Sequence, residues 1–414
     1  MEHTLLIGEL SLNGIINRVN GVLPIVYAAK KAGFTRCIVP QSNVKEGAVV
    51  HDIQVIGVEN LSQVVEYLNE QIIIEPQVIH SGDIFSDRVR DAGIDFADVN
   101  GQELVKRAVE VAVSGMHNFL MIGPPGAGKT MLAKRIPTIM PDLSFEESME
   151  ISKIYSVSGL LSNQQILVTE RPFRAPHHTI TNIALTGGGR TPKPGEISLA
   201  SGGVLFLDEL TEFNRNTIEI LRQPLEERFV TITRLNASYR FPTNFMLVAA
   251  MNPCNCGYYP DRNRCSCTPN QIKQYIGKIS QPLLDRIDIC SEVDGIHYHE
   301  LEQKGNHDTS SVIRKRIMKA RELQEIRYAK ESIRFNAELS PKLISKYCRL
   351  KKEEEMILGD VFEKYNLSAR VYHKILKVAR TIADLDGEEQ ISEKHLREAI
   401  CYRSIDKKYW GCEC

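Results

Sequence analysis

Three continuous apolar runs dominate the middle of the chain. They are NFLMIG at 118–123, GVLFLDE at 203–209 and FMLVAAMN, which ends at residue 252. Runs that do not alternate with polar residues are typical of strands buried on both faces, and the segments between these runs have helical spacing. The pattern therefore predicts an α/β fold with a parallel sheet that is covered by helices on both faces.

The two ends of the chain have different patterns. Residues 1–73 alternate short apolar runs with amphipathic stretches, which predicts a small α/β unit. After residue 309 the apolar runs stop, and segments with helical periodicity follow, with Ser340 and Ser368 at N-cap positions. We therefore expect the chain to end in a helical domain.

These changes along the chain predict its domain organisation. Polar residues and scattered glycines at 74–95 are typical of a linker. We expect a partial α/β domain at 1–73, this linker at 74–95, the parallel-sheet domain at 96–305 and the helical domain at 306–414.

The segment GPPGAGKT follows the first buried run and precedes a helical segment. It fits the pattern G-x-x-x-x-G-K-[ST], whose glycines let backbone N–H groups and the helix N-terminus face phosphate groups. The Lys129 side chain would reach the β- and γ-phosphates, and the Thr130 hydroxyl would bind Mg²⁺. We predict that ATP and Mg²⁺ bind here, with the nucleotide held by Gly123, Pro124, Pro125, Gly126, Ala127, Gly128, Lys129 and Thr130.

The second buried run ends in two acidic residues, Asp208 and Glu209. Taken alone, such an ending is common and often only structural. Downstream of a phosphate-binding loop in the same domain it favours catalysis, with Asp208 holding Mg²⁺ and Glu209 polarising a water for attack on the γ-phosphate. The two motifs together predict ATP hydrolysis.

Two further polar residues have both a functional and a structural interpretation. Asn252 ends the third buried run, where its amide would orient the attacking water or merely terminate the strand. Arg286 lies among acids and apolar residues in PLLDRIDI, so it forms either an intrachain salt bridge or an arginine finger that reaches a neighbouring subunit's nucleotide. Both alternatives stay open at this point.

Four cysteines follow Asn252 closely as two C-x-C pairs: Cys254, Cys256, Cys265 and Cys267. Four thiolates suit a tetrahedral Zn²⁺, although C-x-C is tighter than the usual C-x₂₋₄-C spacing. Free structural thiols and a redox-sensitive pair are the alternatives. A catalytic metal is disfavoured because four thiolates would leave no open coordination position.

The composition of the chain limits the cellular compartments and binding partners that it can have. The 51 basic and 52 acidic residues give a net charge of −1, so binding of nucleic acid requires a local basic patch. The N-terminal residues lack the pattern of a signal peptide, and no run is long and apolar enough to span a bilayer. We expect a cytoplasmic protein without a membrane partner, whose ten cysteines are reduced.

A set of motifs spread over nearly the whole chain resembles the ComM/YifB group of magnesium-chelatase-like AAA+ ATPases. The motifs are GPPGAGKT, RPFRAPHHT, GEISLASGGVLFLDEL, AAMNPCNCGYYPDRNRCSCTP, ISQPLLDRIDI and LSARVYHKILKVARTIADL. The resemblance implies an AAA+ ring, a homo-hexamer, with a helical lid. It also implies that Asn252 is sensor 1, that Arg286 is the trans-acting finger and that Arg370 in LSARVYH is sensor 2.

The resemblance also implies a motor that acts on branched or single-stranded DNA, as a branch-migration helicase in natural transformation or recombination. The magnesium-chelatase side of the family allows an alternative, in which the same ATPase remodels a protein partner. A nucleotide-binding scaffold without turnover is disfavoured by the presence of Lys129, Asp208 and Glu209.

The segment GELSLNGIINRVNGVLPIVYAAKKAGFTRCIVPQSN is similar to the second half of a Lon-protease-like domain. It departs from active Lon because Leu23 stands where the catalytic lysine is expected and because no segment carries the serine. We expect no proteolysis, and we expect the chain to begin part-way through this domain.

Two segments are candidate pore elements. The alternating run FVTITRLNASYRFPTNF predicts a hairpin around Asn236 that offers Arg234 and Arg240 to a phosphate backbone. The segment TGGGRTPKPGE, here called the glycine-rich element, offers Arg190 and Lys193. An ordinary solvated hairpin and a surface turn are the alternatives.

Two other features favour structural interpretations. His177 and His178 have no partner at a metal-ligand spacing, which favours hydrogen bonding within a loop over metal binding or acid–base chemistry. The basic run at 314–331 also contains acids at helical spacing, so we interpret it as a solvated helix face, with DNA contact as the alternative.

Overall fold

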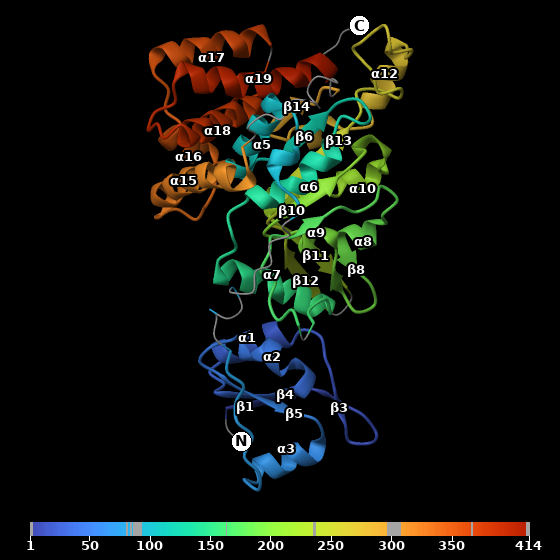
Figure 1. Cartoon of the computed structure of the whole chain (residues 1–414), viewed down its shortest axis with the longest axis vertical. Helices are drawn as coiled ribbons and strands as arrows, with labels where there is room; N and C mark the ends of the chain where they lie inside the picture. Colours follow the sequence, from blue (N-terminus) through green and yellow to red (C-terminus); the bar gives the residue numbers. More distant parts are fainter. Residues whose placement is uncertain are drawn as a thin grey trace.

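The computed structural model describes residues 3–79, 82, 85, 93–162, 164–234, 237–295, 308–365 and 367–410. Figure 1 shows an elongated molecule, with the N-terminal α/β unit at one end and the C-terminal helices beside the central sheet at the other. Several sequence-based boundaries lie outside the described residues. They are half of the linker expected at 74–95, the hairpin tip at Asn236 and the domain boundary at 305/306.

The centre of the fold is a sheet of five parallel strands in the order β14-β6-β13-β10-β7. The predicted parallel sheet is thus confirmed. The three buried runs supply its middle strands, and every residue of these strands is buried. The strand bounds are β6 Phe119–Ile122, β7 Phe173–Arg174, β10 Val204–Leu207, β13 Met246–Met251 and β14 Ile289–Glu292.

Successive residues of the sheet face opposite hydrophobic cores, which explains why these strands carry no polar alternation. Phe119 and Met121 of β6 lie in one core, and Leu120 and Ile122 lie in the other. The first core is closed by α5 (Glu103–Gly115), α6 (Lys129–Ile139) and the C-terminal helices. The second contains residues of four short helices: α10 Arg215–Glu219, α11 Arg222–Glu227, α12 Pro269–Ile276 and α13 Gln281–Leu284.

The N-terminal unit is the small α/β structure that the sequence predicts. Its three parallel strands lie in the order β1-β4-β5, and a short hairpin, β2–β3, projects from them. The strand bounds are β1 Thr4–Leu6, β2 Glu9–Leu10, β3 Ile16–Asn17, β4 Arg36–Pro40 and β5 Gln54–Val58. The helix bounds are α1 Val22–Lys31, α2 Val44–Ala48 and α3 Leu61–Leu68.

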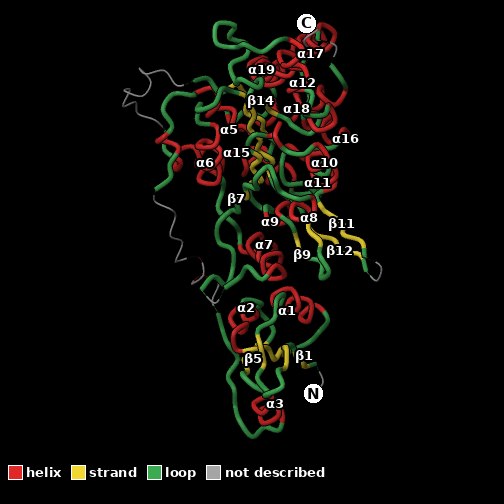
Figure 2. The backbone as a smooth tube through the Cα atoms, turned by 90° about the vertical axis from the view of Figure 1, so that its right-hand side faces the viewer, coloured by secondary structure: helices red, strands yellow, loops and turns green. Residues whose placement is uncertain are grey.

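The N-terminal unit docks on α7 (Phe145–Ser158), as Figure 2 shows, where α1 and α2 face that helix. Leu23 and Met149 belong to one hydrophobic core that spans both parts. The buried Glu46 carboxylate accepts hydrogen bonds from the Leu23 backbone N–H at 3.2 Å and from the Ser156 hydroxyl of α7. Leu23, which stands at the expected lysine position, is therefore a core residue.

The C-terminal part is helical, as predicted. Ser340 caps α16 and Ser368 caps α18, each accepting a hydrogen bond from a backbone N–H of the first turn. The helix bounds are α15 Ser310–Tyr328, α16 Pro341–Tyr347, α17 Lys352–Lys364, α18 Ala369–Leu385 and α19 Glu393–Trp410. No helix among the described residues is long and apolar enough to cross a membrane.

The interpretation of the basic run at 314–331 as a solvated face is wrong for two of its arginines. Arg321 of α15 is buried, donates to the Val113 carbonyl at 2.7 Å and stacks on the ring of Phe335. Arg327 pairs with the buried Asp384 of α18. These cations attach α15 to the neighbouring helices, so they are not available to a polyanion.

Candidate functional site

The segment GPPGAGKT forms a loop, here called the glycine-rich loop, that joins β6 to α6 at the carboxyl edge of the central sheet. Gly126 and Gly128 have φ angles of 77° and 84°, which are left-handed values that favour glycine. A Cβ on Gly123 would lie 2.1 Å from the carbonyl oxygen of Val293, so a side chain does not fit there. The local sequence thus produces a tight turn that ends at the N-terminus of a helix, the geometry that binds phosphate.

The Lys129 side chain is buried and bound to the protein itself. Its Nζ donates to the carbonyl oxygens of Gly123 at 2.7 Å and Pro124 at 2.8 Å, and to Oδ1 of Asn252 at 3.1 Å. Burial lowers the pKa of Lys129, while the nearby Asp208 and Glu209 act in the opposite direction. A bound phosphate would replace neutral carbonyl partners with a full negative charge.

The first acid of the pair after β10 lies directly beside the loop. The Thr130 hydroxyl donates to Oδ2 of Asp208 at 2.5 Å, and Oδ1 of Asp208 accepts from the backbone N–H of Glu209 at 2.9 Å. Hydroxyl and carboxylate oxygens are the ligands that Mg²⁺ takes in phosphate-binding sites. The donor set present at this position therefore fits Mg²⁺.

Glu209 has a left-handed backbone, with φ 50° and ψ 48°, which is uncommon for a residue with a side chain. Its side chain is 59% exposed, and its Oε2 lies 3.7 Å from Nδ1 of His178. His177 instead bonds to the Thr179 hydroxyl at 2.9 Å. The expected hydrogen bonding within a loop thus describes His177. The sequence did not reveal that His178 lies near Glu209, because thirty residues separate the two positions.

Arg370 pairs with Asp285, the residue that precedes Arg286 in the sequence. Nη1 of Arg370 pairs with Oδ2 of Asp285 at 3.3 Å. The neighbouring Arg286 donates to the Pro282 carbonyl at 2.7 Å and pairs with Glu226. The hydrogen bonds and ion pairs found for the two arginines among the described residues do not include the glycine-rich loop.

The intrachain salt bridge considered for Arg286 is therefore present. However, Nε of Arg286 is buried and has no hydrogen-bond partner among the described residues. The pair with Glu226 leaves the guanidinium incompletely satisfied, which is unusual for a purely structural arginine.

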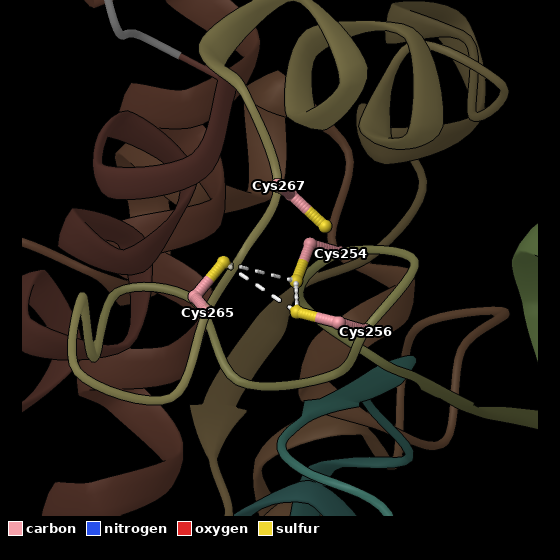
Figure 3. A group of neighbouring side chains, drawn as sticks. All are labelled: Cys254, Cys256, Cys265 and Cys267. Atoms are coloured by element: carbon pink, nitrogen blue, oxygen red, sulfur yellow. Dashed lines mark hydrogen bonds between the residues drawn. The ribbon is translucent and has the colours of Figure 1, made fainter.

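The four cysteine sulfurs converge at one point, as Figure 3 shows. Sγ of Cys254 lies 3.3 Å from that of Cys256 and 3.8 Å from that of Cys265, and all four sulfurs lie within 4.8 Å of one another. Cys254 and Cys265 are buried. The cluster sits on the loop between β13 and α12, close to the glycine-rich loop.

The two candidate pore elements form two hairpins that touch. The predicted hairpin is β11 (Phe229–Thr233) with β12 (Ser238–Pro242), and it extends from the body of the protein in Figure 2. The glycine-rich element forms β8 (Gly187–Gly188) and β9 (Lys193–Pro194). Arg234 joins them by donating to the Gly189 carbonyl at 3.1 Å.

The hairpin arginines are less free than the sequence suggests. Arg234 is engaged by the neighbouring loop, and the Arg240 guanidinium lies 3.4 Å from the centroid of the Phe229 ring. All four of these side chains are exposed, but Arg190 and Lys193 of the glycine-rich element have no side-chain hydrogen bond or ion pair to the described residues. The better candidates for phosphate contact are therefore these two residues.

Comparison with protein families gives three matches along the chain. The family described as magnesium chelatase, subunit ChlI, matches residues 95–301. Its C-terminal companion, magnesium chelatase, subunit ChlI C-terminal, matches residues 307–403. A third family, subunit ChlI of Mg-chelatase, matches residues 1–43.

Curated relatives match almost the full chain. The competence protein ComM of Haemophilus influenzae is 42% identical over 96% of this chain and 77% of its own length. The uncharacterized protein YifB of Escherichia coli is 39% identical over 97% of this chain and 77% of its own length. The magnesium-chelatase subunit ChlI of Guillardia theta is 22% identical over 50% of this chain and 60% of its own length.

Proposed function

Because this chain belongs to the ComM/YifB group of magnesium-chelatase-like AAA+ proteins, we propose that it is an ATPase that works as a ring motor on DNA. One observation supports the ATPase part most directly. At one edge of the sheet, Lys129 and Thr130 at the start of α6 are joined by hydrogen bonds to Asn252 and Asp208, which directly follow β13 and β10. Residues 96–305 are the ATPase domain in this proposal, and residues 306–414 are its lid.

The residues divide the work of phosphoryl transfer among them. The glycine-rich loop and Lys129 hold the β- and γ-phosphates, and Thr130 and Asp208 hold Mg²⁺, which neutralises phosphate charge when bound. Glu209, exposed beside the loop, accepts the proton of the attacking water, and the Asn252 amide orients that water. His178 positions the Glu209 carboxylate from 3.7 Å away.

Arg286 acts on a neighbouring subunit in this proposal, and Arg370 is sensor 2 on the lid. The described contacts of Arg286, with Glu226 and the Pro282 carbonyl, lie away from the loop of its own chain. A nucleotide bound between subunits would offer its γ-phosphate to Arg286, which would stabilise the charge that develops in the transition state, while the lid with Arg370 would relay the nucleotide state to the pore elements. The active form is then a homo-oligomer, which we propose to be a hexameric ring.

The DNA part of the proposal rests on the relatives and on the two touching hairpins. A relative that covers most of this chain is named for competence, the uptake of DNA. Because the net charge of the chain is −1, contact with phosphates must be local, and the exposed Arg190 and Lys193 supply it. We propose branch migration or unwinding of branched or single-stranded DNA in the cytoplasm.

One experiment separates the DNA motor from its alternative, an ATPase that remodels a protein partner as the similarity to magnesium-chelatase subunits allows. The ATPase rate of the purified protein is measured with and without branched DNA over a series of salt concentrations. Stimulation that declines steeply with salt supports the DNA motor, because phosphate contacts release counterions. If the ATPase activity requires Lys129 but is not stimulated by DNA at any salt concentration, the DNA motor is excluded and the remodelling ATPase is favoured.

A further inference from the structure

We propose that Cys254, Cys256, Cys265 and Cys267 bind one structural Zn²⁺ that braces the glycine-rich loop. The first argument is the spacing of the sulfurs. A tetrahedron of sulfurs at about 2.3 Å from zinc has edges of about 3.8 Å. The measured Sγ–Sγ separations of 3.3, 3.5 and 3.8 Å lie close to that edge, and the fourth sulfur is within 4.8 Å of the others.

The shape of the loop explains how two tight C-x-C pairs meet at one point. The backbone N–H of Gly257 donates to the Cys254 carbonyl at 3.0 Å, and Gly257 has a left-handed φ of 85°. This turn brings Cys256 back toward Cys254. On the other side, the N–H of Cys265 donates to the Asp261 carbonyl at 2.8 Å, which closes a second turn before the second pair.

The surroundings suit a metal-thiolate centre rather than four neutral thiols. Two arginines lie in the segment between the cysteine pairs, where Arg264 stacks on the Tyr258 ring and Arg262 on the Tyr259 ring. The Arg262 guanidinium lies 3.5 Å from the Cys267 carbonyl, and its charge would offset that of the centre.

Zinc binding would change the protonation and the net charge of the four cysteines. Each thiol loses one proton, so four thiols and Zn²⁺ give a four-thiolate centre with a net charge of −2 and release four protons. The coordination sphere is then full, so the ion has no position for water or substrate and supplies rigidity alone.

The site lies where rigidity affects the nucleotide pocket. A methyl group on Gly257 would come within 2.5 Å of Cδ of Pro125, so the cysteine loop packs directly on the glycine-rich loop. The same loop begins two residues after Asn252, the partner of Lys129. The zinc would therefore fix the relative position of Pro125 and Asn252. This coupling rests on the proposed nucleotide pocket, whereas the metal site itself does not.

The metal is tested first on the full-length wild-type protein, with no nucleotide present. We expect elemental analysis to find one zinc per chain. Replacement with Co²⁺ should give the strong visible absorption of a tetrahedral four-thiolate site. A metal-free protein, purified under reducing conditions, whose ten cysteines all titrate as free thiols would overturn the proposal, as would a disulfide within the cluster.

Variants then locate the site. Cys256→Ser and Cys267→Ser should each weaken zinc binding at least tenfold, measured by competition with a chromogenic chelator. Cys401→Ser, which changes an exposed cysteine outside the cluster, should retain one zinc. Equal zinc affinity in the cluster variants and in the control contradicts the assignment, and the wild-type Co²⁺ spectrum remains decisive if a variant does not fold.

The coupling to the pocket has its own readout. Zinc removal should weaken binding of a fluorescent ATP analogue at least fivefold without abolishing it. Gly257→Ala should weaken nucleotide binding, because the added methyl group displaces Pro125, and should weaken zinc binding as well, because the turn between Cys254 and Cys256 has the left-handed φ that favours glycine. Unchanged nucleotide affinity after verified zinc removal overturns the bracing role, and a protein that binds zinc but no nucleotide at all instead contradicts the proposed ATPase.

Discussion

Nζ of Lys129 lies 3.1 Å from Oδ1 of Asn252, so the side chain that would bind phosphate is held by the side chain that would orient water. Phosphate must compete with this amide and with two backbone carbonyls for the ammonium group. The strength of that competition depends on the charge at position 252.

Substitutions of Asn252 should therefore separate binding from hydrolysis. Asn252→Asp places a carboxylate against Lys129, and we expect nucleotide affinity to fall about tenfold, since an ion pair replaces a neutral hydrogen bond. Asn252→Ala should leave affinity nearly unchanged but lower the hydrolysis rate by about tenfold to a hundredfold. Titration with a fluorescent nucleotide and steady-state ATPase assays measure the two effects, and equal affinities for the Asp and Ala variants would contradict this account.

Glu209→Gln should bind ATP with Mg²⁺ normally but slow hydrolysis by about 10² to 10⁴, because the variant lacks the proton acceptor. His178→Ala should cause a smaller loss in kcat at unchanged KM, since His178 only positions the carboxylate. His177→Ala is the matched control, because His177 bonds to Thr179 instead. Similar losses for the two histidine variants would show that the contact between His178 and Glu209 has no special role.

Arg286→Ala should lower kcat by about 10³ if the guanidinium stabilises the transferring phosphoryl group. Mixing tests whether it acts in trans. Subunits that carry Arg286→Ala and subunits that carry Lys129→Ala are each inactive, but in a mixed ring an intact loop meets an intact arginine at some interfaces. We expect partial recovery of ATPase activity on mixing, and none if both residues serve the same chain's nucleotide.

Arg190→Ala with Lys193→Ala should reduce the stimulation of ATPase activity by DNA and leave the basal rate unchanged. Each lost phosphate contact should also make the salt dependence of DNA binding shallower by about one unit in a log–log plot. The double variant Lys319→Ala with Lys330→Ala removes two exposed charges from the C-terminal part and serves as the control. A DNA affinity that falls equally in both double variants would indicate non-specific charge attraction.

Asp288, which directly precedes β14, and Lys374 of α18 form an ion pair whose contribution to stability depends on pH. Burial would raise the pKa of Asp288, but Lys374 and His117, each 3.7 Å from its carboxylate, lower it well below the usual range. A lowered carboxylate pKa stabilises the fold above the ordinary pKa of about 4, and this contribution is lost progressively as the pH falls below that value.

Asp288→Asn should thus lower the free energy of unfolding at neutral pH by about 3 kcal/mol, because it removes the carboxylate that pairs with the buried Lys374 and leaves that cation beside the neutral Ile287 carbonyl. The difference from wild type should shrink as the pH falls from about 4 through the lowered pKa, because the wild-type carboxyl becomes protonated first in the unfolded and then in the folded protein. Denaturant titrations at several pH values measure this. Asp52→Asn, which removes an exposed partner of Lys30, should have little effect, and a pH-independent difference for Asp288→Asn would disprove the linkage.

The central sheet and the glycine-rich loop could be predicted because the residues that determine them lie within short segments of the sequence. The runs around Phe119, Val204 and Met246 are apolar at every position, which only a strand between two cores requires. The glycines at 126 and 128 are needed by backbone angles within their own turn. Local signals of this kind survive in a single sequence.

The partners of charged side chains could not be predicted, because they depend on tertiary packing. Arg327 is one of several exposed-looking cations in a basic run, and only the approach of α18 supplies Asp384 as its partner. His178 meets Glu209 for the same reason. The pattern of the sequence predicted the parallel sheet and the helical C-terminal part but gave no information on which cation faces which acid.

Hydrogen bonds connect the N-terminal unit through α7 to the helix that follows β9. Glu46 joins that unit to Ser156 of α7, and on the same helix the Tyr155 hydroxyl donates to the Leu199 carbonyl of α9 (Glu196–Leu199) at 3.1 Å. Helix α9 directly follows β9, which carries Lys193. A displacement of the N-terminal unit would therefore act on α7 and, through the hydrogen bond of Tyr155, on the helix that follows β9.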